Sequence, residues 1–152
     1  MTTVLVLNGP NLNLLGTRKP EVYGSTSLAD VEKMCQSEAD KLDLELVFRQ
    51  SNHEGQLIDW IHEFGREVKA GNSIGAVYNP GAHTHTSIAL HDAIEAASLP
   101  VIETHISNVH GREEFRHHSF ISPVAAGIIV GFGVLGYPMA INALHQLAQA
   151  DR

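Results

Sequence analysis

The sequence predicts an α/β fold in which one parallel β-sheet of five strands carries helices on both faces. Short apolar segments alternate with segments of helical periodicity along the whole chain, which is typical of β-strands joined by crossover helices. The apolar segments are also continuous, as expected of strands that are buried on both faces. With 152 residues, of which 43% are hydrophobic and 18% charged, the chain has the size and composition of one globular domain, which we expect to span residues 1–152.

The first half of the chain contains two expected strands and two expected helices. Residues 4–7 form an apolar run that predicts the first strand, and Asn8-Gly9-Pro10 ends it. Ser27 is placed to cap a helix whose apolar positions recur at helical spacing as far as residue 42. Residues 44–48 predict the second strand. The next helix has apolar positions from residue 57 to residue 68, and Gly71 ends it.

The second half repeats this alternation. Residues 74–78 predict the third strand and residues 86–97 the next helix. Pro100 precedes a fourth strand at 101–105, and an irregular charged segment follows that strand. Residues 128–130 predict the fifth strand, and a last helix begins near Tyr137.

Charge and cysteine content exclude several classes of protein. The formal net charge of −7 and the scattered lysines and arginines disfavour nucleic-acid binding. Cys35 is the single cysteine, so the chain forms neither an internal disulfide nor a cysteine-based zinc cluster, and a reducing cytoplasm is the expected location. No basic residue precedes Arg18, so the first residues predict a strand and not a secretion signal.

One stretch without charged residues raises the question of a membrane span. Residues 119–144 contain no Asp, Glu, Lys or Arg, but prolines and glycines interrupt them repeatedly. Breakers at this density predict a short strand and a terminal helix instead of a transmembrane helix, so we expect no membrane association. Such a segment suits burial within the fold or at a subunit contact.

In parallel sheets the ligand lies beyond the carboxyl ends of the strands, so the polar residues that follow each strand are the candidate site. Each cluster alone is compatible with an ordinary polar loop. Four successive strands, however, deliver such residues to one edge, which predicts a binding site there. These residues are Asn8, Asn11, Asn52, His53, Glu54, Asn79, His83, His85, Glu103, His105, Ser107 and Asn108.

The loop after the first strand resembles a phosphate-binding loop only superficially. Gly9 and Gly16 are too far apart for the G-x-G-x-x-G pattern, and no Gly-Lys-Ser/Thr follows. The asparagines of this loop, Asn11 among them, can hold a substrate oxygen or a water molecule through neutral hydrogen bonds, or they can simply form Asx-turns.

Arg18 lies five residues before Tyr23 in an exposed segment. A tyrosine in such a segment often covers apolar surface. The chemical alternative is a general base, for which a phenol with the reference pKa of about 10 must ionise near neutral pH at a cost of about 4 kcal/mol. A guanidinium about 4 Å away in a partly desolvated site offers an attraction of about that size, so the pair is a candidate for an activated tyrosine.

Histidines after the third strand also permit a metal hypothesis. His83 and His85, with Asp92 downstream and His105 on the next strand, are residue types that bind zinc or iron. The pattern is weak, because neither a His-Glu-x-x-His motif nor a cysteine pair accompanies it. The same groups bind hydroxyls well, and we expect no metal site.

The segment from 103 to 116 is the richest in candidate chemistry. Residues two apart on a strand share a face, so Glu103 can orient and polarise His105, which makes His105 a candidate proton donor. Arg112 and Arg116, one helical turn apart, suit a carboxylated or polyhydroxylated substrate. Alternatively, they form a solvated helix face with the neighbouring glutamates.

Two absences narrow the mechanism. The chain has no Gly-x-Ser-x-Gly nucleophile elbow, and Cys35 falls on the apolar face of a helix, so acyl transfer lacks a nucleophile. The lysines are expected in a loop or on polar helix faces, and not at a buried strand end that would suit imine chemistry. They are Lys19, Lys33, Lys41 and Lys69.

Four motifs, in order and with matching spacing over nearly the whole chain, resemble the type II 3-dehydroquinate dehydratases. The departures are minor, since His83 and Gly111 occupy positions where the family varies. The resemblance implies a flavodoxin-like three-layer sandwich and no cofactor. The motifs are residues 8–13 with Arg18 and Tyr23-Gly24, residues 50–55, residues 79–81 with 84–87, and residues 103–116.

The resemblance implies the dehydration of 3-dehydroquinate to 3-dehydroshikimate, an anti elimination through an enolate without cofactor or covalent intermediate. This step serves the shikimate pathway of aromatic amino-acid biosynthesis and also quinate breakdown. By the same resemblance, Tyr23 removes the proton α to the ketone, and Arg18 on the same lid, residues 16–25, stabilises the tyrosinate. His105, held by Glu103, protonates the departing hydroxyl.

The resemblance also implies the remaining site residues. Asn11 would act through an ordered water that stabilises the enolate. Arg112 would help to close the site, and the backbone amides of two residues after the fourth strand would bind the substrate carboxylate. The residues implied to bind substrate are Asn79, His85, Asp92, Ile106, Ser107, Arg112 and Arg116.

Asp92 matches a family position that reaches the substrate of a neighbouring subunit, which implies a homododecamer built from trimers.

Two other classes of protein stay open at this point. One is a flavodoxin-like module that binds flavin or a phosphorylated ligand without catalysis, and the absorbance of a cofactor would identify it. The other is a metal hydrolase, which chelation would inactivate.

Overall fold

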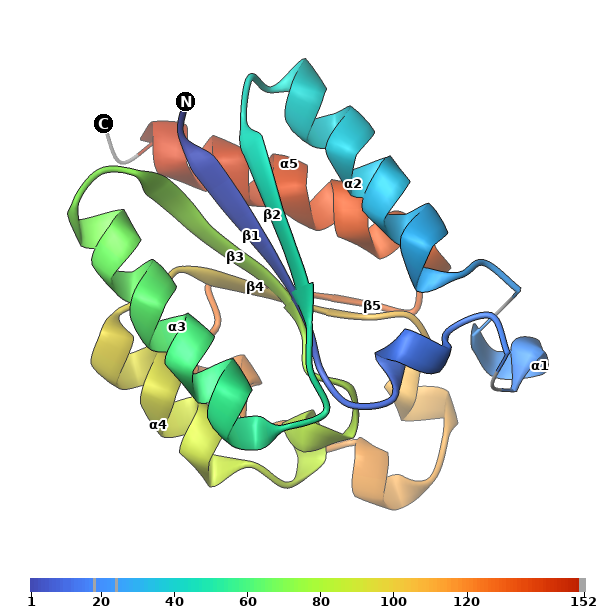
Figure 1. Ribbon diagram of the computed structural model, residues 1–152. Coiled ribbons are helices and arrows are strands. Elements are labelled where there is room, and N and C mark those ends of the chain that lie inside the picture. Colours follow the sequence, from blue (N-terminus) through green and yellow to red (C-terminus); the bar gives the residue numbers. More distant parts are fainter. Residues whose placement is uncertain (18, 24, 151–152) are drawn as a thin grey trace.

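The computed structural model describes residues 1–17, 19–23 and 25–150, and for Val22 and Tyr23 it describes the backbone alone. Its centre is a five-stranded sheet in the order β2-β1-β3-β4-β5, with every neighbouring pair parallel (Figure 1). The predicted parallel sheet is therefore confirmed. The strands are β1 (Thr3–Asn8), β2 (Glu45–Gln50), β3 (Ser73–Asn79), β4 (Val101–His105) and β5 (Gly127–Val130).

Helices cover both faces of the sheet. α2 (Leu28–Lys41) and α5 (Gly136–Ala150) pack together on one face, and α3 (Glu54–Lys69) and α4 (Ile88–Ala97) pack together on the other (Figure 1). A short helical turn, α1 (Pro20–Tyr23), precedes α2. This is the three-layer, flavodoxin-like α/β sandwich that the sequence predicts.

β1 shows why the sequences of these strands are continuous apolar runs. Val4 and Val6 belong to the core cluster beneath α2 and α5, whereas Leu5 and Leu7 belong to the cluster beneath α3 and α4. All four side chains are fully buried. Because successive residues of a strand point to opposite faces, a strand covered on both sides needs an apolar residue at every position.

The helix starts follow local capping chemistry. Ser27 Oγ accepts the amide N–H of Asp30, and the Asp30 carboxylate accepts the N–H of Ser27, each at 3.1 Å, which forms a capping box before α2. α4 begins at Ile88 and not at residue 86 as predicted, because a 3₁₀ turn, η2 (Gly81–His85), occupies the preceding segment. Ser87 Oγ caps α4 by accepting the N–H of Leu90 at 2.9 Å.

The segment between β4 and β5 folds into short 3₁₀ turns, among them η3 (Val109–Gly111), η4 (Glu114–Arg116) and η5 (Ser122–Val124). The prediction that Arg112 and Arg116 lie one turn apart on a helix is wrong. Arg112 ends η3 in an extended conformation, and Glu113 has a ψ of 145°, so the backbone leaves helical geometry between the two arginines.

No helix within residues 1–17, 19–23 and 25–150 is both long and apolar enough to cross a membrane. The uncharged residues 119–144 divide among η5, β5, η6 (Gly133–Leu135) and the start of α5. Burial within the fold explains this composition only in part, because several large apolar side chains of this segment are exposed on the single chain. These are Ile128, Phe132, Leu135 and Met139.

Candidate active site

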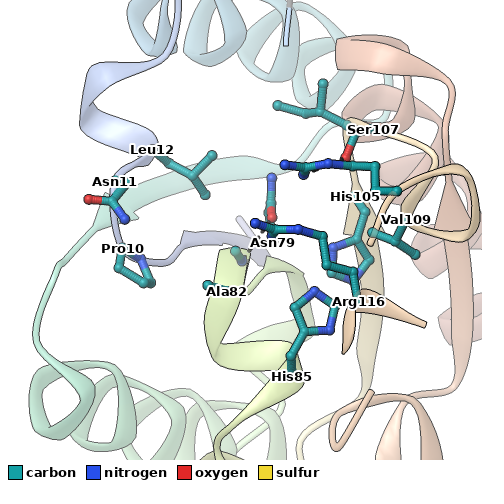
Figure 2. Close-up of a pocket in the computed structure, with 13 residues that line it drawn as sticks. Pro10, Asn11, Leu12, Asn79, Ala82, His85, His105, Ser107, Val109 and Arg116 are labelled. Atoms are coloured by element: carbon teal, nitrogen blue, oxygen red, sulfur yellow. Dashed lines mark hydrogen bonds between the residues drawn. The ribbon is translucent and has the colours of Figure 1, made fainter. Parts of the chain in front are cut away.

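A pocket lies at the carboxyl ends of β1, β3 and β4, the edge at which the sequence analysis expects the ligand (Figure 2). It encloses about 550 Å³ of empty space, part of it open to solvent, which is in the range of small-molecule sites. Eight of the predicted site residues line it. They are Asn11, Asn79, His85, His105, Ile106, Ser107, Arg112 and Arg116.

Glu103 and His105 lie two residues apart on β4 and meet on one face of the strand. His105 Nε2 is 2.5 Å from Glu103 Oε2, and both residues are buried. A carboxylate can only accept a hydrogen bond, so Nε2 carries a hydrogen and donates it. Nδ1 is then the nitrogen of His105 that gains or gives up a proton.

Three hydroxyl groups also reach the carboxylate of Glu103. Ser122 Oγ lies 2.5 Å from Oε1, and Thr84 Oγ1 and Ser119 Oγ lie 2.8 Å and 2.9 Å from Oε2. Burial by itself would raise the pKa of Glu103, but the hydrogen bond and charge of His105 and the hydroxyls of Ser122 and Thr84 outweigh it and lower that pKa. Glu103 is therefore an anion although no part of it is exposed.

His85 presents an acceptor to the pocket. Its Nδ1 lies 2.8 Å from the carbonyl oxygen of His118, which can only accept, so Nδ1 carries the hydrogen and Nε2 has a free lone pair. Burial lowers the pKa of His85, and the charges of His105 and Arg116 act in the same direction against the His118 hydrogen bond, which raises it. His85 is thus a neutral imidazole whose Nε2 can accept a hydrogen bond from a hydroxyl.

Asn79 is held by a buried network that joins three elements. Its Oδ1 accepts the N–H of Gly81 at 3.1 Å, and its Nδ2 donates to the hydroxyl of Tyr137 at 2.8 Å. That hydroxyl donates in turn to Asn8 Oδ1 at 2.7 Å. Burial raises the pKa of Tyr137, so the phenol keeps its hydrogen. Nδ2 of Asn79 has a second hydrogen, which is directed to neither partner and suits a ligand oxygen.

The segment after β4 supplies the cationic wall of the pocket. Arg112 Nη1 donates to Ser107 Oγ at 3.4 Å, and Arg116 Nε donates to Glu113 Oε2 at 2.5 Å. Arg116 lines the pocket together with His85 and His105 (Figure 2), and its charge acts on His85. Guanidinium groups at this position favour a carboxylate or a hydroxyl-rich ligand, although Arg116 also forms the glutamate pair that the alternative interpretation expects.

Asn11 lies across the pocket from His105 (Figure 2). Its backbone has a φ of 69°, in the left-handed region that asparagine tolerates. Its N–H donates to Asn52 Oδ1 at 2.9 Å, and Gln50 Nε2 donates to the same oxygen at 3.1 Å. The loop after β2 therefore fixes the loop after β1, which places Asn11 at the pocket wall.

Besides Glu103, which is fully buried and bonded to His105, three predicted site residues are not among the described residues that line the pocket. Arg18 lies outside the described residues, and so does the side chain of Tyr23, so their roles stay predictions. Asp92 lies on α4 with its side chain 69% exposed, and its Oδ1 is 3.1 Å from His91 Nδ1. It is not among the residues that line the pocket of its own chain.

Neither a metal cluster nor a reactive thiol is present in the part of the chain that the structure describes. No group of three or more His, Cys, Asp and Glu residues is arranged there to hold a metal ion. Cys35 is buried, and burial, with a smaller contribution from Glu32, raises its pKa to about 12. The thiol therefore stays protonated, as expected of a core residue.

Sequence reasoning missed part of the polar network around the site. Ser119, Ser122 and Tyr137 contact site residues, but none follows a strand. The apolar spacing of α5 buries Tyr137 without indicating what its hydroxyl contacts. Glu103 has the one signal that could have suggested such partners, because a carboxylate on a buried strand requires hydrogen-bond donors from elsewhere in the fold.

Comparisons with known proteins identify the family of this chain. The family model described as dehydroquinase class II matches residues 2–145. A 3-dehydroquinate dehydratase of Variovorax paradoxus is 70% identical over 95% of this chain and 99% of its own length, and one of a Marinomonas species is 65% identical over 97% and 99%.

Solved structures agree as well. The type II dehydroquinase of Butyrivibrio crossotus superposes with a TM-score of 0.89 at 45% identity, covering 94% of this chain and 97% of its own. That of Propionibacterium acnes has a TM-score of 0.87 at 39% identity, covering 98% and 97%. The sheet order, the pocket at the strand ends and these matches lead to one conclusion: the chain belongs to the class II dehydroquinase family.

Proposed function

We propose that this chain is a 3-dehydroquinate dehydratase, a hydro-lyase that eliminates water from 3-dehydroquinate to give 3-dehydroshikimate through an enolate. The observation that carries the proposal is the Glu103–His105 pair, whose imidazole lines the pocket. The chain is 52–70% identical to 3-dehydroquinate dehydratases over nearly its full length. A buried, oriented imidazole is the kind of group that protonates a leaving hydroxyl.

His105 acts as the general acid. Its Nε2–H is committed to Glu103, so its Nδ1–H is the proton that passes to the hydroxyl, which then leaves as water. The anionic Glu103 stabilises the protonated imidazole beforehand and holds its ring in place. After the step the imidazole is neutral and takes up a proton for the next turnover.

Tyr23 acts as the general base and takes the proton α to the ketone, with Arg18 as the cation that stabilises the tyrosinate. This assignment rests on the resemblance of residues 8–24 to the family's first motif. Both residues belong to a lid over about residues 16–25 of a single catalytic domain that spans residues 1–152. Anti geometry requires the base on the ring face opposite the departing hydroxyl, so Tyr23 acts from the side opposite His105.

The substrate is bound by groups that match its oxygens. The neutral His85 accepts from a ring hydroxyl, and the second amide hydrogen of Asn79 donates to another. Arg112 and Arg116 provide positive charge for the carboxylate, and the backbone amides of Ile106 and Ser107, directly after β4, bind it. Asn11 acts through an ordered water on the enolate oxygen.

The active enzyme is a homododecamer built from trimers and located in the cytoplasm. Asp92, exposed on α4 and outside its own pocket, completes the substrate site of a neighbouring subunit. Exposed apolar residues of the uncharged segment, such as Phe132 and Leu135, suit contacts between subunits. Neither nucleic acid nor a membrane is a partner.

The test is turnover of 3-dehydroquinate by the purified protein, followed by the ultraviolet absorbance of the conjugated product. We expect turnover that neither borohydride nor a chelator abolishes, because no imine and no metal takes part. Loss of activity with borohydride would indicate a lysine imine, and loss with chelator would indicate a metal enzyme. Tyr23→Phe should lose most of the rate, and a variant that keeps it would exclude Tyr23 as the base.

A further inference from the structure

We propose that Ser122, with Thr84 and Ser119, positions the catalytic pair: the three hydroxyls hold Glu103 in its anionic form and thereby fix His105 for proton donation. The inference rests on the proposed function, because it concerns the proton donor of that reaction. It assigns a role to side chains that contact neither the pocket nor, in our proposal, the substrate.

The hydrogens of this cluster all lead toward the carboxylate. Ser119 Oγ accepts the backbone N–H groups of Ile121 and Ser122, both at 3.0 Å. Its own hydrogen is therefore donated, either to Glu103 Oε2 at 2.9 Å or to Thr84 Oγ1 at 2.7 Å. In both arrangements Thr84 can donate to Oε2 at 2.8 Å. Each hydrogen thus reaches Glu103 directly or through Thr84.

A protonated Glu103 does not fit this arrangement. A carboxylic acid must donate one hydrogen, whereas His105 Nε2 and the three hydroxyls already donate toward its oxygens. The added hydrogen would either displace a hydroxyl, which costs a buried hydrogen bond, or lie between Oε2 and His105 Nε2. In the second case the hydroxyls donate to a neutral acid, and hydrogen bonds to a neutral acceptor are weaker than those to an anion. The cluster therefore selects the anion.

Ser122 has a separate task within the cluster. Ser122 Oγ donates to Glu103 Oε1 at 2.5 Å, whereas the side chains of His105, Thr84 and Ser119 contact Oε2. Donors on both oxygens fix the rotation of the carboxylate about its last bond, so Oε2 stays directed at His105 Nε2. Without Ser122 only the donors on Oε2 oppose that rotation.

The segment that carries the hydroxyls is itself tied to the pocket. The N–H of Phe120 donates to the carbonyl oxygen of Thr84 at 2.7 Å, and His85 Nδ1 donates to the carbonyl of His118 at 2.8 Å. These two hydrogen bonds therefore hold η2 and residues 118–122 together. The hydroxyls that hold Glu103 and the imidazole that faces the ligand share the same support.

The charges around His105 require Glu103 to be an anion. The charged and titratable groups around His105 are Glu103 on its own strand, His85 on η2, and Arg112 and Arg116 on the segment between β4 and β5. His85 is neutral, and the two arginines are cationic and oppose a positive charge on His105. Glu103 is the negative group that balances them, so hydroxyls that keep it ionised preserve the acid form of His105.

The experiment compares matched variants in the dehydratase assay. Thr84→Val removes the hydroxyl and keeps the shape, whereas Thr84→Ser keeps the hydroxyl and loses a methyl group. Ser122→Ala and Ser122→Thr form the corresponding pair at the half-buried Ser122. We expect Thr84→Val and Ser122→Ala to lower kcat about tenfold, the order expected for one hydrogen bond to a charged group, with KM changed less than about twofold. The variants that keep the hydroxyl should stay near wild type.

The pH profile separates positioning from simple packing. With one donor fewer, Glu103 takes up a proton at a higher pH, so the acid limb of kcat in Thr84→Val and Ser122→Ala should move to higher pH. Ser73→Ala is the control, because Ser73 is a buried serine at the opposite end of β3 and bonds the carbonyl of Thr3 at 3.2 Å. It should lose stability without a change in kcat or in the pH profile.

The outcomes distinguish this inference from the proposed function. Wild-type protein without turnover contradicts the proposed function. Active wild type, with Thr84→Val and Ser122→Ala equal to it in kcat and pH profile, overturns the positioning role. If Ser122→Ala fails to fold, the two Thr84 variants provide the test. If Thr84→Ser is as slow as Thr84→Val, any change of shape at this position lowers kcat, and the role of the hydroxyl is overturned. If Thr84→Val alone is slow, the inference is supported.

Discussion

The side-chain amide of Asn79 donates to the hydroxyl of Tyr137 across 2.8 Å, although the two residues are 58 positions apart in the chain. Asn79 ends β3 at the pocket, and Tyr137 lies in the first turn of α5 beneath the sheet. The bond ties a pocket-lining amide to the helix layer on one face. Since the same hydroxyl also donates to Asn8, two strand ends depend on one phenol.

Replacing Tyr137 with Phe should therefore affect both stability and substrate binding. The change removes one donor and one acceptor and leaves the amides of Asn79 and Asn8 without this partner in a buried place. We expect the free energy of unfolding to fall by about 1–3 kcal/mol. KM should rise severalfold, because Asn79 is then free to reorient. Urea unfolding and steady-state kinetics measure the two effects.

Tyr78→Phe is the matched control for that prediction. Tyr78 is also fully buried, but its hydroxyl has no hydrogen-bond partner among the residues that the structure describes. The same chemical change there should leave stability unchanged or slightly increased, since an unsatisfied polar group is removed. Equal losses in the two variants would show that burial of the ring, and not the Asn79–Tyr137 bond, explains the effect.

Glu103 should make stability depend on pH. Its hydrogen-bond donors lower its pKa in the folded protein below the ordinary value of 4.5. The ionised carboxylate therefore stabilises the fold fully above that value, and this contribution is lost as pH falls through the lowered pKa. Glu103→Gln has no ionised carboxylate and so lacks this stabilisation. Its side-chain NH₂ group would also face the N–H and O–H donors that surround Glu103 in the wild type. We expect it to cost about 3–5 kcal/mol at pH 7 and about a hundredfold in kcat.

Urea unfolding at a series of pH values provides the measurement. The difference in unfolding free energy between wild type and Glu103→Gln should be largest near neutral pH and should shrink below about pH 4. Glu45→Gln, at an exposed position of β2, should change neither stability nor kcat. A difference that stays constant down to low pH would mean that Glu103 is not ionised in the folded protein.

His85 should remain neutral and keep its hydrogen on Nδ1. Burial lowers its pKa below the ordinary 6.5, and the carbonyl of His118 requires a donor at Nδ1. In protein labelled with ¹⁵N in its histidines, nuclear magnetic resonance should show a titration midpoint below 6.5 for His85 and the Nδ1–H tautomer above it. His85→Ala identifies the signal. An Nε2–H tautomer would contradict the acceptor role of His85 toward a substrate hydroxyl.

The fold was predictable because its signals are local. The apolar run of residues 4–7 requires burial on two faces, and Ser27 provides an N-cap without reference to the rest of the chain. The pairing of Glu103 with His105 was predictable for the same reason, since the period of a strand alone places residues two apart on one face. Each of these three predictions follows from residues close together in the sequence, so none requires knowing which distant segments are in contact.

The parts that sequence reasoning missed depend on contacts between distant segments. Tyr137 is 129 positions from Asn8, and Ser122 is 19 positions from Glu103 across irregular backbone, so no periodicity relates them. The helical spacing expected for Arg112 and Arg116 failed because extended backbone separates two short turns. Both arginines still line the pocket. The segment that carries them joins β4 to β5 and begins at the sheet edge where the pocket lies, so it stays near that edge without being helical.

Gly9 should be essential for the shape of the pocket. A Cβ added there would lie 2.3 Å from the carbonyl oxygen of Pro80, and the N–H of Gly9 already donates to the carbonyl of Asn79 at 2.8 Å. Neither backbone can move without disturbing the strand ends that carry the site. We expect Gly9→Ala to lower the free energy of unfolding by about 1–3 kcal/mol and to lower kcat/KM as well.

Gly55→Ala makes the same chemical change where space is available. A Cβ at Gly55, in the first turn of α3, meets nothing within 4 Å, and its backbone is not in the left-handed region. Alanine there should stabilise the fold by about 0.4–1 kcal/mol, because it restricts the unfolded chain. Urea unfolding of both variants tests the pair. If Gly9→Ala were as stable and active as Gly55→Ala, the contact between the loops after β1 and β3 would have no part in shaping the site.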